Sequence, residues 1–185
     1  MSKWTSMGAW AIAALLMTGC GCGEQRLPDP PPKTAPSKAD LMEFQRERAL
    51  ALDSLMTARS ESWSNVVRTG TGIRYEVLDR TAGPAANIAV DALAQGTVLE
   101  LHHRFGLLDG RSITSWQQHG PLAFEPGATD LPAGFHELVG LLQIGDSVRA
   151  LIPPSQAWGM SGRPPEIPQE AVIHVEMRVD LYFRP

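Results

Sequence analysis

The side chains of this sequence that could do chemistry are few: two cysteines and five histidines. Cys20 and Cys22 lie near the start of the chain, so the rest of the sequence has no disulfide and no cysteine-based metal site. His102 and His103 are adjacent on a predicted strand and point to opposite faces, which makes them a poor metal pair. No Ser-His-Asp set, phosphate-binding glycine loop or paired-carboxylate motif stands out, and we expect no metal and no cofactor. The remaining histidines are scattered: His119, His136 and His174.

Cys20 suits a covalent role at the end of an export signal. Lys3 is the only charged residue before Glu24, and an apolar run follows over Met7–Met17. These 11 residues would form a helix of about 16 Å, roughly half the hydrocarbon thickness of a bilayer. Residues 1–19 are therefore predicted to be a secretory signal and not a membrane span.

The residues from Leu15 to Cys20 resemble the bacterial lipobox, in which the cysteine becomes the lipid-carrying first residue of the mature protein. Several acyl chains, at about 0.8 kcal/mol per buried methylene, give stable anchoring. Two alternatives stay open: a plain cleaved signal with an incidental cysteine, and Cys22 as the site. Gly21 follows Cys20, without the aspartate that signals inner-membrane retention, so we expect the outer membrane, facing the periplasm of a Gram-negative bacterium.

Residues 20–37 are predicted to be a proline-rich tether. Five prolines and few large apolar groups favour extended polyproline conformers, which at about 3.1 Å per residue would reach roughly 50 Å. The rest of the chain is long enough for one domain and an appendage. The net charge of −4 argues against a nucleic-acid partner.

A helical segment is expected over residues 38–69, with the helix itself running from 38 to about 59. Ser37 can cap this helix, and Asp40 suits its first turn. One face carries Leu41, Phe44, Leu52 and Leu55, and a second set repeats at seven residues, Met42, Ala49 and Met56. An apolar stripe on a helix must pack on something. We favour packing on the chain's own domain, and a homodimer through residues 38–60 is the alternative.

The glycines at 70 and 72 mark the start of a domain over residues 70–185, where the pattern changes to period two. Apolar and polar residues alternate or cluster as in strands over four runs. Asp109-Gly110 indicates a turn, and residues 133–142 could form a single short helix. One helix against a mostly antiparallel sheet predicts an α+β domain. The four runs are residues 73–78, 98–105, 147–152 and 172–183.

A set of short motifs in this domain resembles the FKBP-type peptidyl-prolyl cis-trans isomerases, over about residues 70–183. With the signal, tether and helix, the chain is similar to the exported lipoprotein form of that family in Gram-negative bacteria. The resemblance implies a twisted antiparallel β-sheet wrapped over one short helix, preceded here by an N-terminal helix. The motifs are Gly72-Ile73-Arg74-Tyr75-Glu76, Leu108-Asp109-Gly110-Arg111, Gly134-Phe135-His136-Glu137-Leu138, Gly145-Asp146, Ile152-Pro153-Pro154, Ala157-Trp158-Gly159 and Ile167-Pro168.

The implied reaction is rotation about the amide bond that precedes proline. Partial double-bond character gives this bond a barrier of about 18–20 kcal/mol. A twisted amide has lost resonance and charge separation, so a dry apolar site favours it over the planar ground state. Such a site needs no nucleophile and no metal.

The resemblance places several residues at the family's pocket. Phe135 falls on the aromatic floor, and Trp158 falls on an aromatic wall position where its indole N–H replaces a phenol as donor. Leu131 and Ile167 fall on the apolar rim. Departures from the family pattern are also expected to line the site: His103 for a tyrosine, Ile113 and Thr114 for Phe-Asp, Val175 and Leu122 for aromatics, and Pro132 where the family has a backbone N–H.

We therefore expect a lipid-anchored peptidyl-prolyl isomerase that assists the folding of exported proteins. Its expected partners are proline-containing polypeptide segments and, through the lipid, a membrane. His103 is a candidate for the polar group of the pocket. Because the departures remove aromatic contacts and a carboxylate, the alternative is a non-catalytic chaperone or peptide-binding module.

Overall fold

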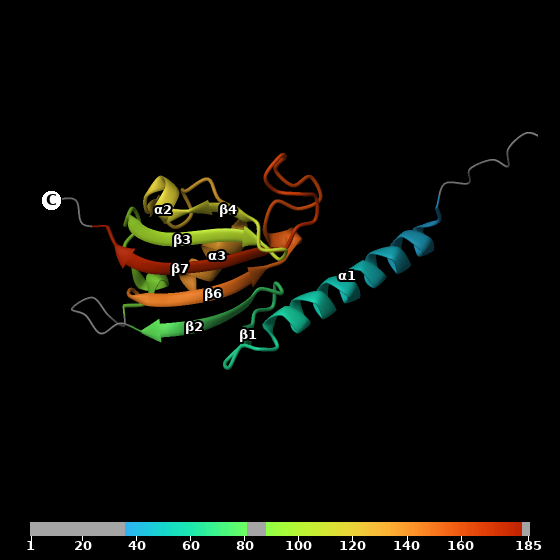
Figure 1. The fold of residues 1–185 in the computed structure, drawn as a ribbon, viewed down its shortest axis with the longest axis horizontal. Helices are drawn as coiled ribbons and strands as arrows, with labels where there is room; N and C mark the ends of the chain where they lie inside the picture. Colours follow the sequence, from blue (N-terminus) through green and yellow to red (C-terminus); the bar gives the residue numbers. More distant parts are fainter. Residues whose placement is uncertain (1–35, 81–87, 183–185) are drawn as a thin grey trace, which may run out of the picture. The chain divides into compact units, whose positions relative to one another are not determined.

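The computed structural model of this chain describes residues 36–80 and 88–182 (Figure 1). The predicted signal peptide, Cys20 and most of the tether lie outside the described residues. Residues 38–185 are separated from the preceding residues as one compact unit. Its helices are α1 (Lys38–Ser60), α2 (Trp116–His119) and α3 (Ala133–Gly140), with 3₁₀ turns η1 (Val90–Ala92) and η2 (Pro154–Gln156).

Seven strands form one antiparallel sheet in the order β1-β2-β6-β7-β3-β4, with β5 paired to the beginning of β3. The pairing of β3 with β7 is the longest and runs from Leu99 opposite Leu181 to Leu107 opposite Ile173. The strands are β1 (Val67–Arg68), β2 (Arg74–Arg80), β3 (Leu99–Leu107), β4 (Ser112–Ser115), β5 (Leu122–Phe124), β6 (Asp146–Ile152) and β7 (Ile173–Leu181).

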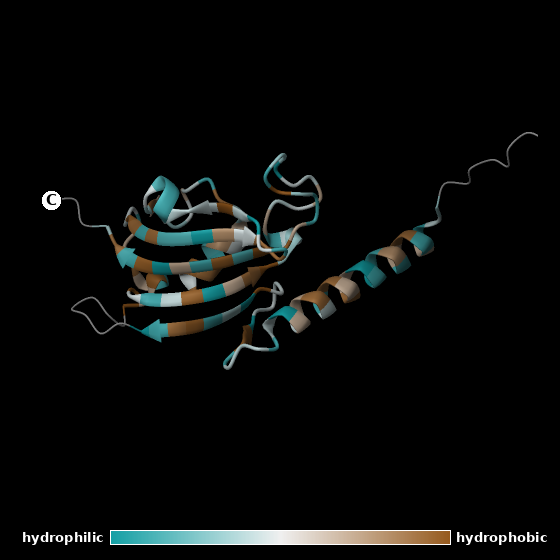
Figure 2. Ribbon diagram, in the orientation of Figure 1, coloured by the Kyte–Doolittle hydropathy of each residue, from teal (hydrophilic) through white to brown (hydrophobic). Residues whose placement is uncertain are grey.

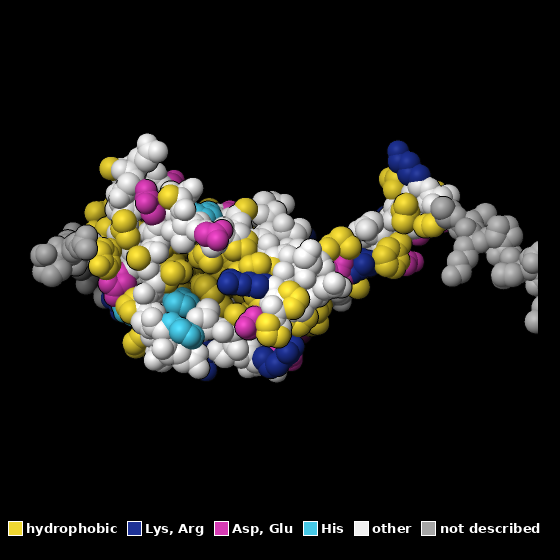
Figure 3. Space-filling view, turned by 90° about the horizontal axis from the view of Figure 1, so that it is seen from above, with side chains coloured by type: hydrophobic (Ala, Val, Ile, Leu, Met, Phe, Trp, Pro, Cys, Tyr) yellow, Lys and Arg dark blue, Asp and Glu magenta, His cyan; other side chains and the backbone are white. Residues whose placement is uncertain are grey.

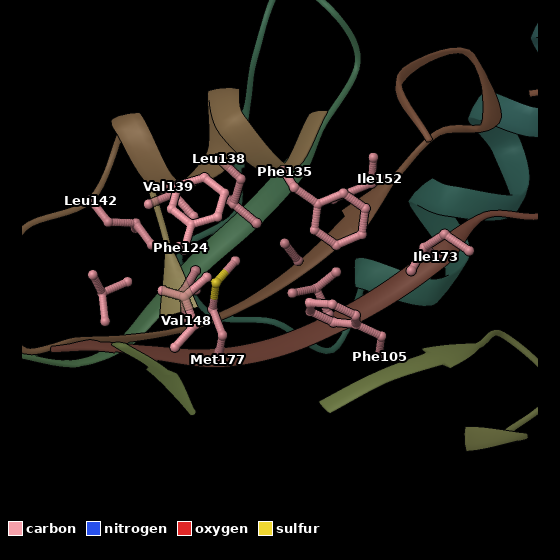
Figure 4. Packing of buried hydrophobic residues seen from close by; sticks show 14 of the residues in the cluster. Phe105, Phe124, Phe135, Leu138, Val139, Leu142, Val148, Ile152, Ile173 and Met177 are labelled. Carbon is pink, nitrogen blue, oxygen red and sulfur yellow. The ribbon is translucent and has the colours of Figure 1, made fainter. Parts of the chain in front are cut away.

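Alternation along the strands decides which face of the sheet is buried (Figure 2). In β7, Ile173, Val175, Met177 and Val179 are buried, while the residues between them lie nearer solvent. α3 covers the buried face, and Figure 4 shows its Leu138 among the side chains of this core. The predicted α+β fold is thus confirmed: an antiparallel sheet curves over one short helix, after an N-terminal helix.

Short elements were the part of the fold that the pattern did not predict. α2, β4 and β5 have only four, four and three residues, too few to establish a period. β1 lies before the expected boundary at Gly70 and pairs with β2, so the sheet takes in part of the helical segment. No helix within residues 36–80 and 88–182 is long and apolar enough to cross a membrane.

The C-terminal half of α1 packs against the domain. Met56 is 2% exposed and lies in a cluster with Leu151 and Val172. This confirms packing on the chain's own domain for that half of the helix and removes Met56 from the surface that a second copy could contact. The N-terminal half of α1 instead has the exposed apolar side chains Leu41, Met42 and Phe44, and Leu50 near the middle of the helix is also exposed.

β2 departs from simple alternation because α1 and the segment after it cover its polar side. Arg74 is 5% exposed and Glu76 is 4% exposed. The guanidinium of Arg74 donates to the Asp53 carboxylate at 2.9 Å and to the Thr57 hydroxyl at 2.8 Å, both on α1. These paired charges hold the helix on the sheet edge.

Glu76 joins the segment after α1 to the sheet. Its carboxylate accepts from the backbone N–H groups of Ser64 and Asn65 at 2.9 and 3.0 Å, and from Arg149 Nε at 2.7 Å. The Arg149 guanidinium also lies 4.8 Å from the centre of the Trp63 ring. Burial alone would raise the pKa of Glu76, but the Asn65 N–H, Arg149 and the Ser64 N–H together hold the pKa below its ordinary value of 4.5.

We expect acid to destabilise the fold partly through Glu76. Its stabilising contribution is complete above pH 4.5 and is lost as the pH falls through the lowered folded-state pKa. Glu76→Gln should therefore lower the melting temperature at pH 7 and flatten its decline between pH 5 and pH 3, measured by circular dichroism. Glu61→Gln, at an exposed carboxyl nearby, is the control. If the melting temperatures of the natural chain, Glu76→Gln and Glu61→Gln fell equally with pH, Glu76 would not be a source of the acid sensitivity.

Candidate functional site

An apolar hollow of about 410 Å³, here called the pocket, opens between β3, β4, the turn after α2 and the loop after η2. Figure 3 shows yellow apolar walls with histidine and cationic side chains at the border. Its lining residues are His103, Phe105, Ile113, Thr114, His119, Gly120, Pro121, Leu122, Leu131, Trp158, Arg163, Glu166 and Ile167.

Aromatic rings packed in series form the base of the pocket. The ring centres of Phe105 and Phe135 lie 4.8 Å apart, and those of Phe135 and Trp158 lie 5.5 Å apart in an edge-on arrangement. Phe135 is 1% exposed and lies beneath the lining side chains, on the face of α3 that meets the sheet. Tilted and edge-on ring pairs of this kind add rigidity to a site as well as buried area.

The loop after η2 forms a second wall by folding back on itself. Arg163 and Ile167 exchange backbone hydrogen bonds of 2.8 and 2.9 Å, which places Ile167 over the pocket with 2% of its surface exposed. Gly162 precedes this bridge with a φ of 63°. A Cβ at Gly162 would overlap the Ile167 carbonyl and lie 2.6 Å from the Pro168 backbone.

Gly162→Ala is expected to damage the pocket more than Gly159→Ala does. Both glycines have a left-handed φ, 63° and 62°, but a Cβ at Gly159 meets nothing closer than 3.9 Å. The left-handed strain alone costs roughly 1–2 kcal/mol, and forced displacement at Gly162 adds about 1–3 kcal/mol. Urea denaturation and titration with a proline peptide measure both effects, and equal losses in the two variants would contradict the steric explanation.

Polar groups form a chain along one side of the pocket. His103 Nδ1 lies 3.3 Å from the Leu101 carbonyl, and His103 Nε2 lies 3.5 Å from Thr114 Oγ1. The same hydroxyl lies 3.2 Å from Nδ1 of His119, at the end of α2. Burial lowers the pKa of His103, and the neighbouring His119 and His102 lower it further, while the Leu101 carbonyl opposes the shift. His103 is therefore neutral at pH 7.

A second, more polar hollow adjoins the pocket across Trp158 and Arg163. It is lined by Asp130, Leu131, Pro132 and Ala157 in addition to these two residues. Pro132 directly precedes α3 and has no N–H, and the N–H of Leu131 donates to the Thr129 carbonyl at 2.8 Å. The donors at this edge are therefore the side chains of Trp158 and Arg163 and not the backbone of the Leu131–Pro132 pair.

Most of the predicted site residues meet at the pocket. Phe135 supports it from below. Val175 is fully buried in the core and does not line the pocket, which corrects the expectation that it lines the site. Its cross-strand partner Phe105 does line the pocket. The predicted residues that line the pocket are His103, Ile113, Thr114, Leu122, Leu131, Trp158 and Ile167.

Several lining residues were not predicted. Alternation along β3 could have identified Phe105, because it lies two residues after His103 on the same face. His119, Arg163 and Glu166 had no such signal, since a four-residue helix and an irregular loop bring them to the pocket. Among the described residues, no group of three or more His, Cys, Asp or Glu side chains is arranged to hold a metal ion.

Comparison with solved structures identifies the same fold elsewhere. The crystal structure of AtFKBP13 matches with a TM-score of 0.53 and 20% identity, over 62% of this chain and 96% of that chain. The peptidyl-prolyl cis-trans isomerase from Pseudomonas syringae pv. tomato str. DC3000 matches with a TM-score of 0.57 and 21% identity, over 72% and 92%. The fold and its apolar pocket thus define an FKBP-like domain.

Sequence comparison gives the family. Residues 91–180 match the family described as FKBP-type peptidyl-prolyl cis-trans isomerase. The chain is 26% identical over 126 residues to Peptidyl-prolyl cis-trans isomerase FKBP11 of Bos taurus, covering 62% of each. It is 25% identical over 122 residues to FK506-binding protein 4 of Dictyostelium discoideum, covering 66% of this chain and 31% of that protein. The chain thus spans less than two thirds of these relatives, and the match to the FKBP-type peptidyl-prolyl cis-trans isomerase family holds for its domain over residues 91–180.

Proposed function

We propose that this protein accelerates the cis–trans isomerisation of bonds preceding proline in exported polypeptides, while lipid on Cys20 holds it at a membrane. The observation that carries the catalytic part is the pocket, where Trp158, Leu131 and Ile167 surround an apolar space above the buried ring of Phe135. The family that the domain matches supports the same reaction.

The geometry suits a twisted amide better than a planar one. Apolar walls hold the proline ring and exclude water, which removes the solvation that favours the charge-separated planar amide. The indole N–H of Trp158 can donate to a peptide carbonyl at the border of the two hollows. No covalent intermediate is required, because the reaction only rotates a bond.

An isomerisation assay on residues 38–185 tests catalysis, since this part of the chain forms a compact unit with its own core. We expect the cis-to-trans rate of a succinyl-Ala-Leu-Pro-Phe-4-nitroanilide peptide to rise in proportion to protein concentration. A rate equal to that of the uncatalysed peptide, from protein shown to be folded by circular dichroism, would refute the catalytic proposal.

A non-catalytic chaperone is the second candidate, and an additional groove favours it. The groove has a volume of about 520 Å³ and lies between α1 and the loop after η2, where Leu52 and Leu55 face Pro154 and Met160. Met160 is 67% exposed and Leu55 is 52% exposed. Suppression of aggregation of an unfolded protein, retained without any isomerase activity, would favour this function.

Export and anchoring are supported by the pattern of residues 1–20. Cys20→Ala should abolish incorporation of labelled palmitate and release the protein from the membrane fraction, whereas Cys22→Ala should change neither. Labelling that depends on Cys22 alone would assign the lipid to Cys22. If the natural chain incorporates no palmitate, the proposed lipid anchor is refuted. Outer-membrane placement facing the periplasm is part of the same proposal, tested by separating the two membranes on a density gradient.

Self-association through residues 38–60 stays a prediction. Its support is now limited to the exposed apolar side chains in the N-terminal half of α1, including Leu41, Met42 and Phe44. Sedimentation equilibrium of residues 38–185, beside a variant with these three residues replaced by glutamine, tests it. Equal monomer masses for both would refute the dimer.

A further inference from the structure

The polar chain of the pocket connects a buried backbone carbonyl to the protein surface. At its inner end, His103 is 5% exposed and lies beside the Leu101 carbonyl at 3.3 Å. At its outer end, the His119 side chain is exposed and lines the pocket. Thr114 Oγ1 joins the two imidazoles, at 3.5 Å from His103 and 3.2 Å from His119.

When His103 is neutral, donor and acceptor rules fix which group donates in each of these three hydrogen bonds. A carbonyl oxygen only accepts, so His103 Nδ1 carries the proton and donates to Leu101. His103 Nε2 is then an acceptor, and the Thr114 hydroxyl donates to it. Because a hydroxyl has a single proton, Thr114 Oγ1 must accept from Nδ1–H of His119. In the neutral ring of His119, the remaining nitrogen, Nε2, then has a free lone pair.

We propose that His119 is a substrate-binding residue of the isomerase site, whose Nε2 accepts a hydrogen bond from a backbone N–H of the bound peptide. This inference rests on the proposed function, that the pocket binds peptides containing proline. A peptide N–H that loses water without finding an acceptor costs binding free energy. Thr114 and His103 act through His119 as positioning residues, because they hold its ring and select its tautomer.

The Glu166 carboxylate is a charged side-chain acceptor that also lines the pocket, and it is less suited to this role than His119. It is exposed on the loop after η2, and within the described part of the chain no hydrogen bond or ion pair orients its carboxylate. An unoriented side chain must lose rotamer freedom on binding. His119 is already held by Thr114 at one nitrogen, so its acceptor is pre-organised.

Protonation of His103 can reverse the donor and acceptor roles in the hydrogen bonds that join His103, Thr114 and His119. His103 Nε2–H then donates to Thr114 Oγ1, which frees the Thr114 hydroxyl proton to donate to Nδ1 of His119, and a neutral His119 in that tautomer presents Nε2–H to the pocket. The charged or titratable groups nearby are His102 on β3 and Arg163 and Glu166 on the loop. Burial lowers the pKa of His103 below its ordinary 6.5, so His103 itself stays neutral through neutral pH.

A thermodynamic cycle between His119 and the peptide tests the hydrogen bond. The probes are succinyl-Ala-Leu-Pro-Phe-4-nitroanilide and two analogues in which the Leu or the Phe amide N–H is replaced by an ester oxygen. Dissociation constants are measured by fluorescence for the natural chain and for His119→Phe, which keeps a ring and removes the lone pair. Gln117→Leu, an exposed neighbour on α2 that does not line the pocket, is the control.

We expect His119→Phe to weaken binding of the all-amide peptide about 3- to 10-fold, and to leave binding of one ester analogue unchanged. Equal weakening of all three peptides, or of none, would overturn the assignment while leaving the proposed isomerase function intact. Failure of the natural chain to bind any of the peptides would overturn both. If the protein is an active isomerase but His119→Phe weakens binding of the all-amide peptide and of both ester analogues to the same extent, only the role of His119 is refuted.

Nitrogen NMR of the imidazoles supplies a readout that is independent of the peptide. At pH 7.5, Nε2 of His119 should show the shift of an unprotonated nitrogen, and Nδ1 that of a protonated one. Thr114→Val keeps the shape of the side chain and removes its hydroxyl, so the tautomers of His119 should then mix. A protonated Nε2 in the natural chain at this pH would refute the predicted direction.

Discussion

Phe135→Ala is expected to lower the free energy of unfolding by about 3–5 kcal/mol. Phe135 is 1% exposed, and its ring lies 4.8 Å from that of Phe105 and 5.5 Å from that of Trp158. Truncation leaves a cavity that these neighbours cannot fill without moving the floor of the pocket. Urea denaturation followed by circular dichroism measures the change.

The control for Phe135 is the same substitution at an exposed phenylalanine. Phe44 on α1 is 52% exposed, so Phe44→Ala should change the free energy of unfolding by less than about 0.5 kcal/mol. Phe135→Leu, which keeps most of the apolar volume, should fall between the two. If Phe135→Ala were no more damaging than Phe44→Ala, the packing described for α3 and the sheet would be wrong.

Trp158→Ala is expected to lower kcat/KM for a proline peptide about 10- to 100-fold without unfolding the domain. Trp158 is half-buried and borders both hollows, so truncation removes an apolar wall and a donor together. Loss of a hydrogen bond accounts for about 0.5–1.5 kcal/mol, loss of the wall accounts for the rest, and each 1.4 kcal/mol is about a factor of ten.

Trp158→Phe separates these two contributions. It keeps the wall and removes the N–H, so its kcat/KM should fall only about 3- to 10-fold. Tyr182→Ala, at an exposed aromatic side chain that follows β7, should leave the activity unchanged. Equal activity of the alanine and phenylalanine variants would assign the whole effect to the donor, contrary to the apolar mechanism.

The departures from the family pattern have a structural consequence at the pocket. Ile113 and Thr114 both line it, but Thr114 does so as the middle member of a hydrogen-bond chain and not as a charge. His103, the expected polar group of the pocket, is nearly inaccessible, whereas His119 at the other end of these hydrogen bonds is exposed. The site is less aromatic than the family pattern implies, yet its walls remain mostly apolar.

Much of the fold was predictable because the periodicity of a strand or helix is a local property. Alternation over residues 172–183 identified β7 and its buried face, and the apolar repeat after Ser37 identified α1. The positions of Phe135 and Trp158 followed from motif spacing, and the structure places one beneath the pocket and the other on its wall. The signal and lipidation site remain predictions from the first 20 residues.

Tertiary structure alone decided which polar residues are buried and which reach the pocket. Alternation places Arg74 and Glu76 on a face that would meet water, and they are buried because α1 and the segment after it cover that face. His119 and Arg163 come from elements too short or irregular to have a period. Phe105 lines the pocket, whereas its cross-strand partner Val175 is buried in the core. Local pattern specifies the face of an element, whereas contact between distant elements depends on how they pack.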